Sequence, residues 1–168
     1  YELSHIGKIP SKMPPQVSLL HASMLVQIFE DEKQIFDSLK KTGHLPDATK
    51  KDISYVRERL SFAKKWVDEF ADEQYKFKLQ HKVPDDLNLE QKQRKALHEV
   101  AELLKEKEYD EKTLFNEFYE VSKKLDLNPQ DFFKAAYKVL LNKERGPKLA
   151  PFILTLGKEK VIKLFEGI

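Results

Sequence analysis

The spacing of apolar residues constrains the fold of this chain more than any other feature. Apolar side chains recur every three to four positions over long stretches, and no segment alternates apolar and polar residues as a half-buried strand does. The five glycines stand at the breaks between these stretches. We therefore predict an all-α fold, a bundle or cage of about six to eight helices that forms one domain or two helical subdomains.

Two long helices are predicted in the first half of the chain. The first covers residues 16–41 and follows a proline-rich, extended arm. The second covers residues 49–74, and its apolar face is expected to include Phe62, Trp66 and Phe70. Both helices have the length and the apolar spacing of elements that pack against a core.

Three further helices are predicted in the second half, each after a residue that can cap a helix: Asn88, Asp110 and Asn128. The last of these runs to about Asn142, and its apolar side chains cover nearly the whole circumference, which is typical of a helix surrounded by others. Two short helices, residues 152–156 and 158–166, follow. The polar connector at residues 76–87 divides the chain into predicted subdomains 1–75 and 88–168.

The residue types exclude most kinds of chemistry. No cysteine occurs, which excludes disulfides, thiolate zinc sites and cysteine nucleophiles. The glycines are too scattered to form a phosphate-binding loop, and the five histidines are at least 16 residues apart. We expect no catalytic residue and no metal site.

The cellular setting is also predicted from the sequence. No apolar run approaches the roughly 20 residues that cross a bilayer, and no signal peptide opens the chain, so we expect a soluble cytoplasmic protein without membrane contact. The chain begins with Tyr1 and not with Met, which favours a fragment of a longer protein.

Positive charge gathers at one end of the chain. The whole chain carries a formal charge of +2, whereas residues 134–168 hold eight Lys or Arg side chains against three acidic ones. Such a segment can hold the phosphate backbone of a nucleic acid, and the helix start after Gly146-Pro147 would add free N–H groups. The candidate RNA-binding residues are Lys134, Lys138, Lys143, Arg145, Lys148 and Lys158, with Arg57 and Lys64 on one face of the second helix. An ordinary solvated basic face is the alternative.

Aromatic residues could stack on the bases of an RNA loop. Phe133 and Tyr137 are spaced for one helix face, where burial in the core is the alternative interpretation. Tyr75, Phe77 and His81 lie at or in the polar connector, where burial is less assured and stacking is more plausible.

Three stretches resemble class I lysyl-tRNA synthetases of the archaeal type. Residues 142–157, Asn-Lys-Glu-Arg-Gly-Pro-Lys-Leu-Ala-Pro-Phe-Ile-Leu-Thr-Leu-Gly, with the following 158–165, are similar to the closing segment of that family. Residues 66–77, and the proline-rich opening followed by residues 25–28, are similar to its earlier segments. The resemblance extends over essentially all 168 residues.

This resemblance implies an enzyme that activates lysine with ATP and Mg²⁺ and esterifies tRNA(Lys). The nucleotide fold and its signature loops would lie upstream of Tyr1, in a catalytic domain to which residues 1–75 would connect. The chain itself would form an α-helical cage that holds the anticodon end of the tRNA, without a cofactor of its own. The alternative is a helical protein-interaction or scaffold module, which the near-neutral charge favours and which predicts a contiguous apolar patch.

Overall fold

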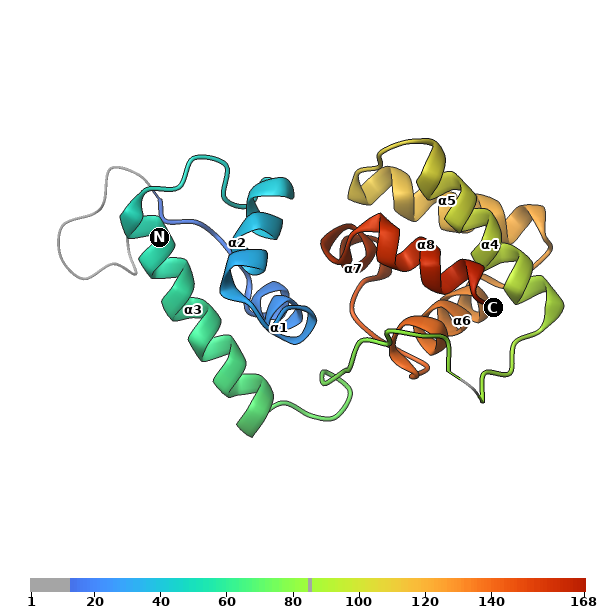
Figure 1. Cartoon of the computed structure of the whole chain (residues 1–168), viewed down its shortest axis with the longest axis horizontal. Coiled ribbons are helices and arrows are strands. Elements are labelled where there is room, and N and C mark those ends of the chain that lie inside the picture. The colour runs from blue at the N-terminus through green and yellow to red at the C-terminus, as the bar shows by residue number, and fades with distance from the viewer. Residues whose placement is uncertain (1–12, 85) are drawn as a thin grey trace.

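The computed structural model describes residues 13–84 and 86–168, and all regular secondary structure in these ranges is helical. Its eight helices are α1 (Leu19–Ile28), α2 (Glu32–Lys41), α3 (Lys50–Glu69), α4 (Gln91–Glu106), α5 (Glu111–Lys124), α6 (Pro129–Leu141), α7 (Leu149–Leu156) and α8 (Lys158–Glu166). Figure 1 shows two groups side by side, α1–α3 and α4–α8, joined by the segment between α3 and α4. The predicted all-α fold is confirmed.

The first group is built around the contact between α1 and α3. Leu25 from α1, Leu39 from α2 and Val56 from α3 are fully buried in its core. Thr49 caps α3: its hydroxyl accepts a hydrogen bond from the amide N–H of Asp52, whose carboxylate accepts one from the N–H of Thr49. This reciprocal cap fixes where the long helix begins.

The prediction of one helix over residues 16–41 is wrong. The backbone is extended at Phe29, with φ −119° and ψ 131°, and α2 begins anew after Asp31. The Asp31 carboxylate accepts a hydrogen bond from the amide N–H of Lys33 at 2.9 Å, the contact that a helix N-cap makes. The apolar spacing continues through this break because both helices face the same core. The break places Phe29 against both cores of the molecule.

Three other helix boundaries also differ from the prediction. Helix α3 ends at Glu69 rather than near residue 74. Helix α4 begins after Glu90 and not after Asn88. Leu89 is buried in the core before the helix starts, and the Gln93 side chain accepts a hydrogen bond from the amide N–H of Glu90 at the cap. Helix α7 already begins at Leu149, since Pro151 lies in its first turn, where a missing N–H removes no helical hydrogen bond.

The larger core belongs to the second group. Helix α6 contacts α4, α5 and α8, so its predicted central position is confirmed. Phe118, Phe132, Phe152 and Phe165 are fully buried there, each from a different helix. Asn142 ends α6 in the left-handed region, at φ 51° and ψ 40°, and the loop to α7 starts from this turn.

Helix α1 links the two groups. Its residues Met24 and Ile28 are buried in the core of the second group, and α1 also contacts α7. Gln27 fastens the connector to it: its Nε2 donates to the carbonyl oxygen of Tyr75 at 3.1 Å, and its Oε1 accepts from the amide of Phe77 at 2.8 Å. The boundaries at residues 75 and 88 stay a prediction, while the groups themselves share a packed junction.

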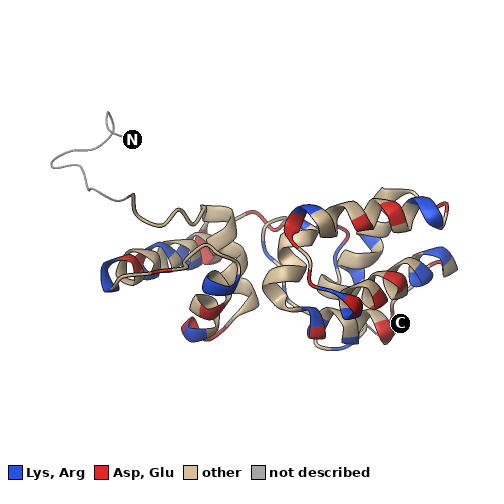
Figure 2. Ribbon diagram, turned by 90° about the horizontal axis from the view of Figure 1, so that it is seen from above, with Lys and Arg blue, Asp and Glu red and all other residues tan. Residues whose placement is uncertain are grey.

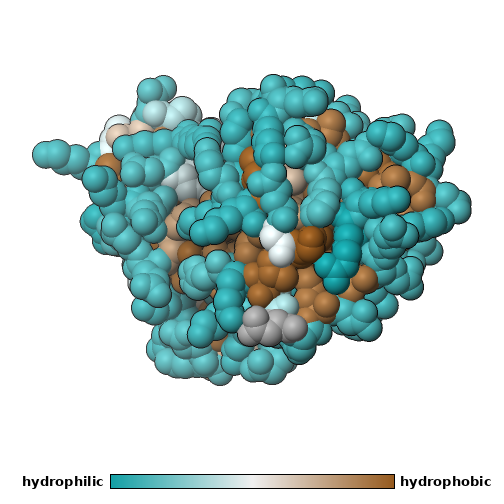
Figure 3. Space-filling model, turned by 45° about the vertical axis from the view of Figure 1, so that its right-hand side comes forward, coloured by the Kyte–Doolittle hydropathy of each residue, from teal (hydrophilic) through white to brown (hydrophobic). Residues whose placement is uncertain are grey.

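The surface carries charges of both signs. Figure 2 shows Lys, Arg, Asp and Glu interspersed over both helix groups, and the formal charge of the whole chain is +2. The face seen in Figure 3 is mostly hydrophilic, and hydrophobic side chains show chiefly in its middle. None of the helices in the described part of the chain is long and apolar enough for a membrane span.

Candidate nucleic-acid interface

Three of the eight predicted RNA-binding residues are engaged within the protein. The Lys143 ammonium donates to two carbonyl oxygens, of Glu73 at 2.8 Å and of Lys76 at 2.6 Å, and so fastens the loop after α6 to the connector. Lys158 donates to a Glu108 carboxylate oxygen at 2.5 Å, which lowers the pKa of that carboxyl below its usual value. Part of the basic excess of residues 134–168 is therefore already neutralised.

The third engaged residue is Arg57 on α3. Its guanidinium donates from Nε and Nη2 to Glu32 of α2, at 2.8 Å and 2.7 Å. These hydrogen bonds, and the attraction between the charges, lower the pKa of Glu32 and raise that of Arg57. A guanidinium held in this way is less free to bind a phosphate.

The remaining candidates have no ionic partner within residues 13–84 and 86–168. Arg145 and Lys148 are exposed and stand close together on the loop between α6 and α7. Lys134 and Lys138 lie on α6, and Lys64 lies on α3 in the other group. Arg145 and Lys148 thus share one loop, whereas the other three candidates lie on helices.

The α6–α7 loop is fixed on a tyrosine of α6. The hydroxyl of Tyr137 donates to the carbonyl oxygen of Pro147 at 2.5 Å, and burial raises the pKa of Tyr137 to about 12, so it stays a donor at neutral pH. Gly146 packs directly on the ring: a Cβ there would lie 2.8 Å from Tyr137 Cδ1 and 2.7 Å from Leu141 Cδ1. With Lys143 on its other side, the loop holds Arg145 and Lys148 in defined places.

A hollow of about 580 Å³ opens at the junction of the two helix groups, and we name it the junction hollow. It lies between α1, the segment that follows α3, and the α6–α7 loop, and Arg145 and Lys148 are on its rim. Trp66 and Tyr75 form an aromatic pair at its wall, with ring centroids 5.6 Å apart. Its lining also includes side chains that can donate or accept hydrogen bonds: Ser18, His21, Gln27, His44 and Gln74.

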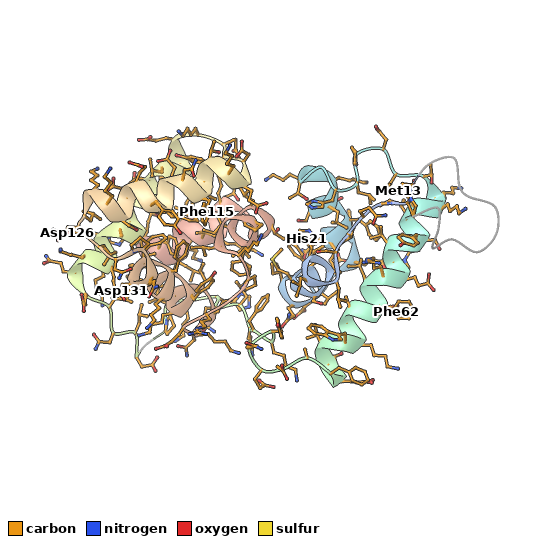
Figure 4. The ribbon with its side chains drawn as sticks, turned by 180° about the vertical axis from the view of Figure 1, so that it is seen from behind. Met13, His21, Phe62, Phe115, Asp126 and Asp131 are labelled. Carbon is orange, nitrogen blue, oxygen red and sulfur yellow. The ribbon has the colours of Figure 1, made fainter. Side chains whose placement is uncertain are left out.

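His21 lies between the two groups, as Figure 4 shows from behind. Its ring stacks on that of His44, with centroids 4.4 Å apart and planes 18° from parallel. Burial, with the nearby His44 as a second cause, lowers the pKa of His21 to about 4. Its Nε2 is buried without a hydrogen-bond partner among the described residues. His21 is therefore neutral at physiological pH and adds no positive charge to the hollow.

A second hollow, of about 620 Å³, lies on the other side of Lys148, and we name it the aromatic hollow. Phe115 of α5, Phe133 of α6 and the ring of Tyr137 line it, and Glu111, Lys148 and Pro151 line both hollows. The sequence prediction missed Phe115. Its signal was present, because Phe115 and Tyr119 are four residues apart and outside the apolar face that Leu114 and Phe118 form.

The other predicted stacking residues take different positions. Tyr75 is 44% exposed and lines the junction hollow. Phe77 also reaches that hollow, but it packs edge-on against buried Phe152 at 5.6 Å, so it belongs largely to the core. His81 is exposed and lines neither hollow.

Comparison with known proteins identifies the family. A family model described as an anticodon binding domain matches residues 22–165. Lysine–tRNA ligases align with nearly the whole chain: that of Thermococcus kodakarensis is 37% identical over 97% of it, that of Pyrococcus horikoshii 34% over 97%, and that of Borreliella burgdorferi 35% over 98%.

The chain spans about a third of the length of these relatives, 31% in each case. The similarity to lysyl-tRNA synthetases that the sequence predicted is confirmed, although the relatives are not archaeal only, since a bacterium is among them. Because the family model covers most of its residues, this chain belongs to the anticodon-binding domains, and it corresponds to the anticodon-binding part of lysine–tRNA ligases.

Proposed function

We propose that this chain binds the anticodon end of tRNA(Lys) as part of a class I lysine–tRNA ligase of the archaeal type, an enzyme that attaches lysine to tRNA with ATP in the cytoplasm. One observation carries the proposal: Arg145 and Lys148 stand on a fixed loop between two hollows, and neither side chain has an ionic partner in the described structure. Cations in this position can hold the sugar–phosphate backbone while bases enter the hollows on either side.

The rigidity of the loop supports this role. Because Tyr137, Gly146 and Lys143 already hold the loop, little conformational freedom is lost when RNA binds. The junction hollow offers hydrogen-bonding side chains beside the aromatic pair Trp66 and Tyr75, which is the combination used to recognise unpaired bases. A merely solvated basic face would need neither the fixed loop nor the hollows.

Lysine activation itself is assigned to a part of the ligase outside this chain. Across residues 13–84 and 86–168, no three His, Asp or Glu side chains converge where they could hold a metal ion. The scattered glycines also provide no loop for the phosphates of ATP. We propose that ATP and Mg²⁺ bind in the catalytic domain of the full-length enzyme.

The test measures binding of tRNA(Lys) to this chain by fluorescence anisotropy over a series of salt concentrations. We expect affinity to fall steeply as salt rises, since each phosphate contact releases counterions. Changing Arg145→Glu and Lys148→Glu together should weaken binding and reduce the slope of log K against log salt by roughly 1.4, because two phosphates would no longer be neutralised. Lys143 stays unchanged, because its loss would disturb the loop.

The matched control reverses the same number of charges at Lys95 and Lys123, which are exposed and line neither hollow. Lys95→Glu with Lys123→Glu should retain most of the affinity. If the two double variants bind tRNA equally well, the assigned face is wrong. If the unaltered chain shows no salt-dependent binding of tRNA, the proposed function fails.

One observation favours a second function, docking of a protein surface. Tyr55, Phe62 and Trp66 share one face of α3, and Phe70 follows at its C-cap. Phe62 and Phe70 are 62% and 66% exposed, contrary to the predicted buried face. Helix α3 is covered mainly from the side of α1, and Figure 4 shows Phe62 on its outer side. Exposed aromatic groups of this size mark contact surfaces.

The partner that we propose for this face is the remainder of the ligase polypeptide, since the relatives are about three times as long as this chain. In the full-length enzyme, Phe62→Gln with Phe70→Gln should lower the melting temperature and the lysylation rate. The same pair should leave the stability and RNA affinity of the present chain unchanged. Full-length enzyme that keeps its stability and rate would exclude this docking role.

A further inference from the structure

The aromatic hollow presents a supported ring to solvent. Phe115 is 45% exposed, and Phe133 lies against it with ring centroids 6.4 Å apart and planes 28° from parallel. Tyr119 stands beside it at 5.0 Å, tilted by 59°. An aromatic ring held on two sides by other rings keeps its exposed face in one orientation. Such a face is ready to stack on another planar group.

The lining of this hollow combines apolar side chains with three charged ones, and its one uncharged hydroxyl is already engaged. The hydroxyl of Tyr137 is occupied by the carbonyl oxygen of Pro147, and the apolar part of the lining is Phe115, Phe133, Leu149, Ala150 and Pro151. The polar side chains in its lining are charged: Lys112, Lys148 and Glu111. The junction hollow shares Glu111 and Lys148 with it, but is also lined by uncharged amide, hydroxyl and imidazole groups.

Charge favours an anionic ligand at the rim. Lys112 and Lys148 outnumber Glu111. Lys148 has no ionic partner in the part of the chain that the structure describes, whereas the charge of Lys112 is attracted to that of Asp110. Lys148 also lines the junction hollow, so one side chain lies between both spaces. An RNA strand held at Lys148 could thus place neighbouring bases on its two sides.

We propose that the aromatic hollow takes one unstacked nucleobase of the bound RNA loop, stacked on Phe115 with its phosphate at Lys148, and accepts any of the four bases. This inference rests on the proposed function and adds a second subsite to it. Base recognition is confined to the junction hollow, and the aromatic hollow contributes affinity without selectivity, because every base has a face that can stack.

The experiment uses this chain and an anticodon stem-loop RNA of tRNA(Lys). Phe115→Leu keeps an apolar side chain but removes the stacking surface, and should weaken binding at least about fivefold. The slope of affinity against salt should stay unchanged, because the phosphates remain bound. Phe115→Trp should retain affinity. The matched control is Phe62→Leu on α3, where a more exposed phenylalanine undergoes the same change.

A set of RNA probes then locates the base. Each probe lacks one loop base and keeps its phosphate. For one of them, the unaltered chain and Phe115→Leu should bind equally. Replacing that base by each of the other three should change the affinity of the unaltered chain by less than about threefold, as a stacking contact predicts.

The outcomes separate this inference from the proposed function. If Arg145→Glu with Lys148→Glu weakens binding while Phe115→Leu matches Phe62→Leu, the stacking subsite is absent and the function stands. If the sensitive base cannot be exchanged without a large loss, the claim of non-selective binding is overturned. If the unaltered chain does not bind the stem-loop at any salt concentration, the proposed function itself fails.

Discussion

Gly146→Ala tests whether the α6–α7 loop is fixed by close packing. A methyl group at this position would lie 2.7 Å from Leu141 Cδ1 and 2.8 and 2.9 Å from two carbons of the Tyr137 ring. Carbon atoms in contact normally stand roughly 3.5–4.0 Å apart, so both neighbours would have to retreat by about 1 Å. Leu141 is buried, and Tyr137 is tied to Pro147, so neither can move freely.

The magnitude follows from overpacking. Forcing an extra methyl group into a filled site costs about 1–3 kcal/mol. A cost of about 2 kcal/mol in a protein of this size lowers the melting temperature by roughly 4–8 °C. The backbone of Gly146 lies outside the left-handed region, so the whole effect is steric. The loop should also shift, and with it Arg145 and Lys148, which predicts weaker tRNA binding at temperatures where the variant is folded.

The assay is thermal and urea unfolding, with Gly43→Ala as the comparison. Gly43 has open space around its Cβ position but φ +76°, so alanine there costs about 1–2 kcal/mol through backbone strain alone. A double-mutant cycle separates the two causes. Removing the ring with Tyr137→Ala should reduce the cost of Gly146→Ala, but should leave the cost of Gly43→Ala unchanged. Strict additivity at both glycines, or an unaltered melting temperature for Gly146→Ala, would refute the packing argument.

Three further predictions concern the same region. Lowering the pH from 6.5 towards 4 should destabilise the fold by about 1–2 kcal/mol through His21, a value reduced for partial solvent screening. The reason is that His21 of the unfolded chain binds a proton more readily than His21 of the folded chain. His21→Phe should flatten the pH profile of the urea midpoint. Lys143→Met should cost about 1–2 kcal/mol in urea unfolding, since two carbonyl oxygens lose a charged donor. Asn142→Ala should lower the stability measured by urea unfolding by about 1 kcal/mol and Asn142→Gly should not, because only the alanine variant is strained at φ 51°. A flat pH profile of the unaltered chain would contradict the argument for His21, and full stability of Lys143→Met that for Lys143. Equal stabilities of Asn142→Ala and Asn142→Gly would contradict the argument for Asn142.

The helical class and half of the helix starts were predictable, because their signals are local. Asp110 and Asn128 cap α5 and α6 as expected, through bonds to residues two or three positions ahead. The break between α1 and α2 was not predicted, since both helices face one core and so keep the apolar period across the break. The local signal for the break is Asp31, which caps α2, but the apolar spacing continues past it.

The interface was predictable only in part. The basic excess of residues 134–168 pointed to the α6–α7 loop, where Arg145 and Lys148 stand exposed. The sequence could not show that Lys143 instead hydrogen-bonds carbonyl oxygens some 70 positions away along the chain. The apolar spacing of α5 placed Phe115 outside the face of Leu114 and Phe118, but it could not show that Phe133 and Lys148 line one hollow with Phe115. Contacts between distant segments decided both cases.

The position of α1 has a consequence for dissecting this protein. Met24 and Ile28 fill space among helices of the second group, although they belong to the first. A truncation that keeps residues 88–168 alone would expose to solvent the apolar surface that these two side chains cover, and the loss of that burial costs stability in proportion to the area exposed. A minimal RNA-binding unit must therefore retain α1 for the packing of Met24 and Ile28, although neither side chain carries a charge that could bind a phosphate.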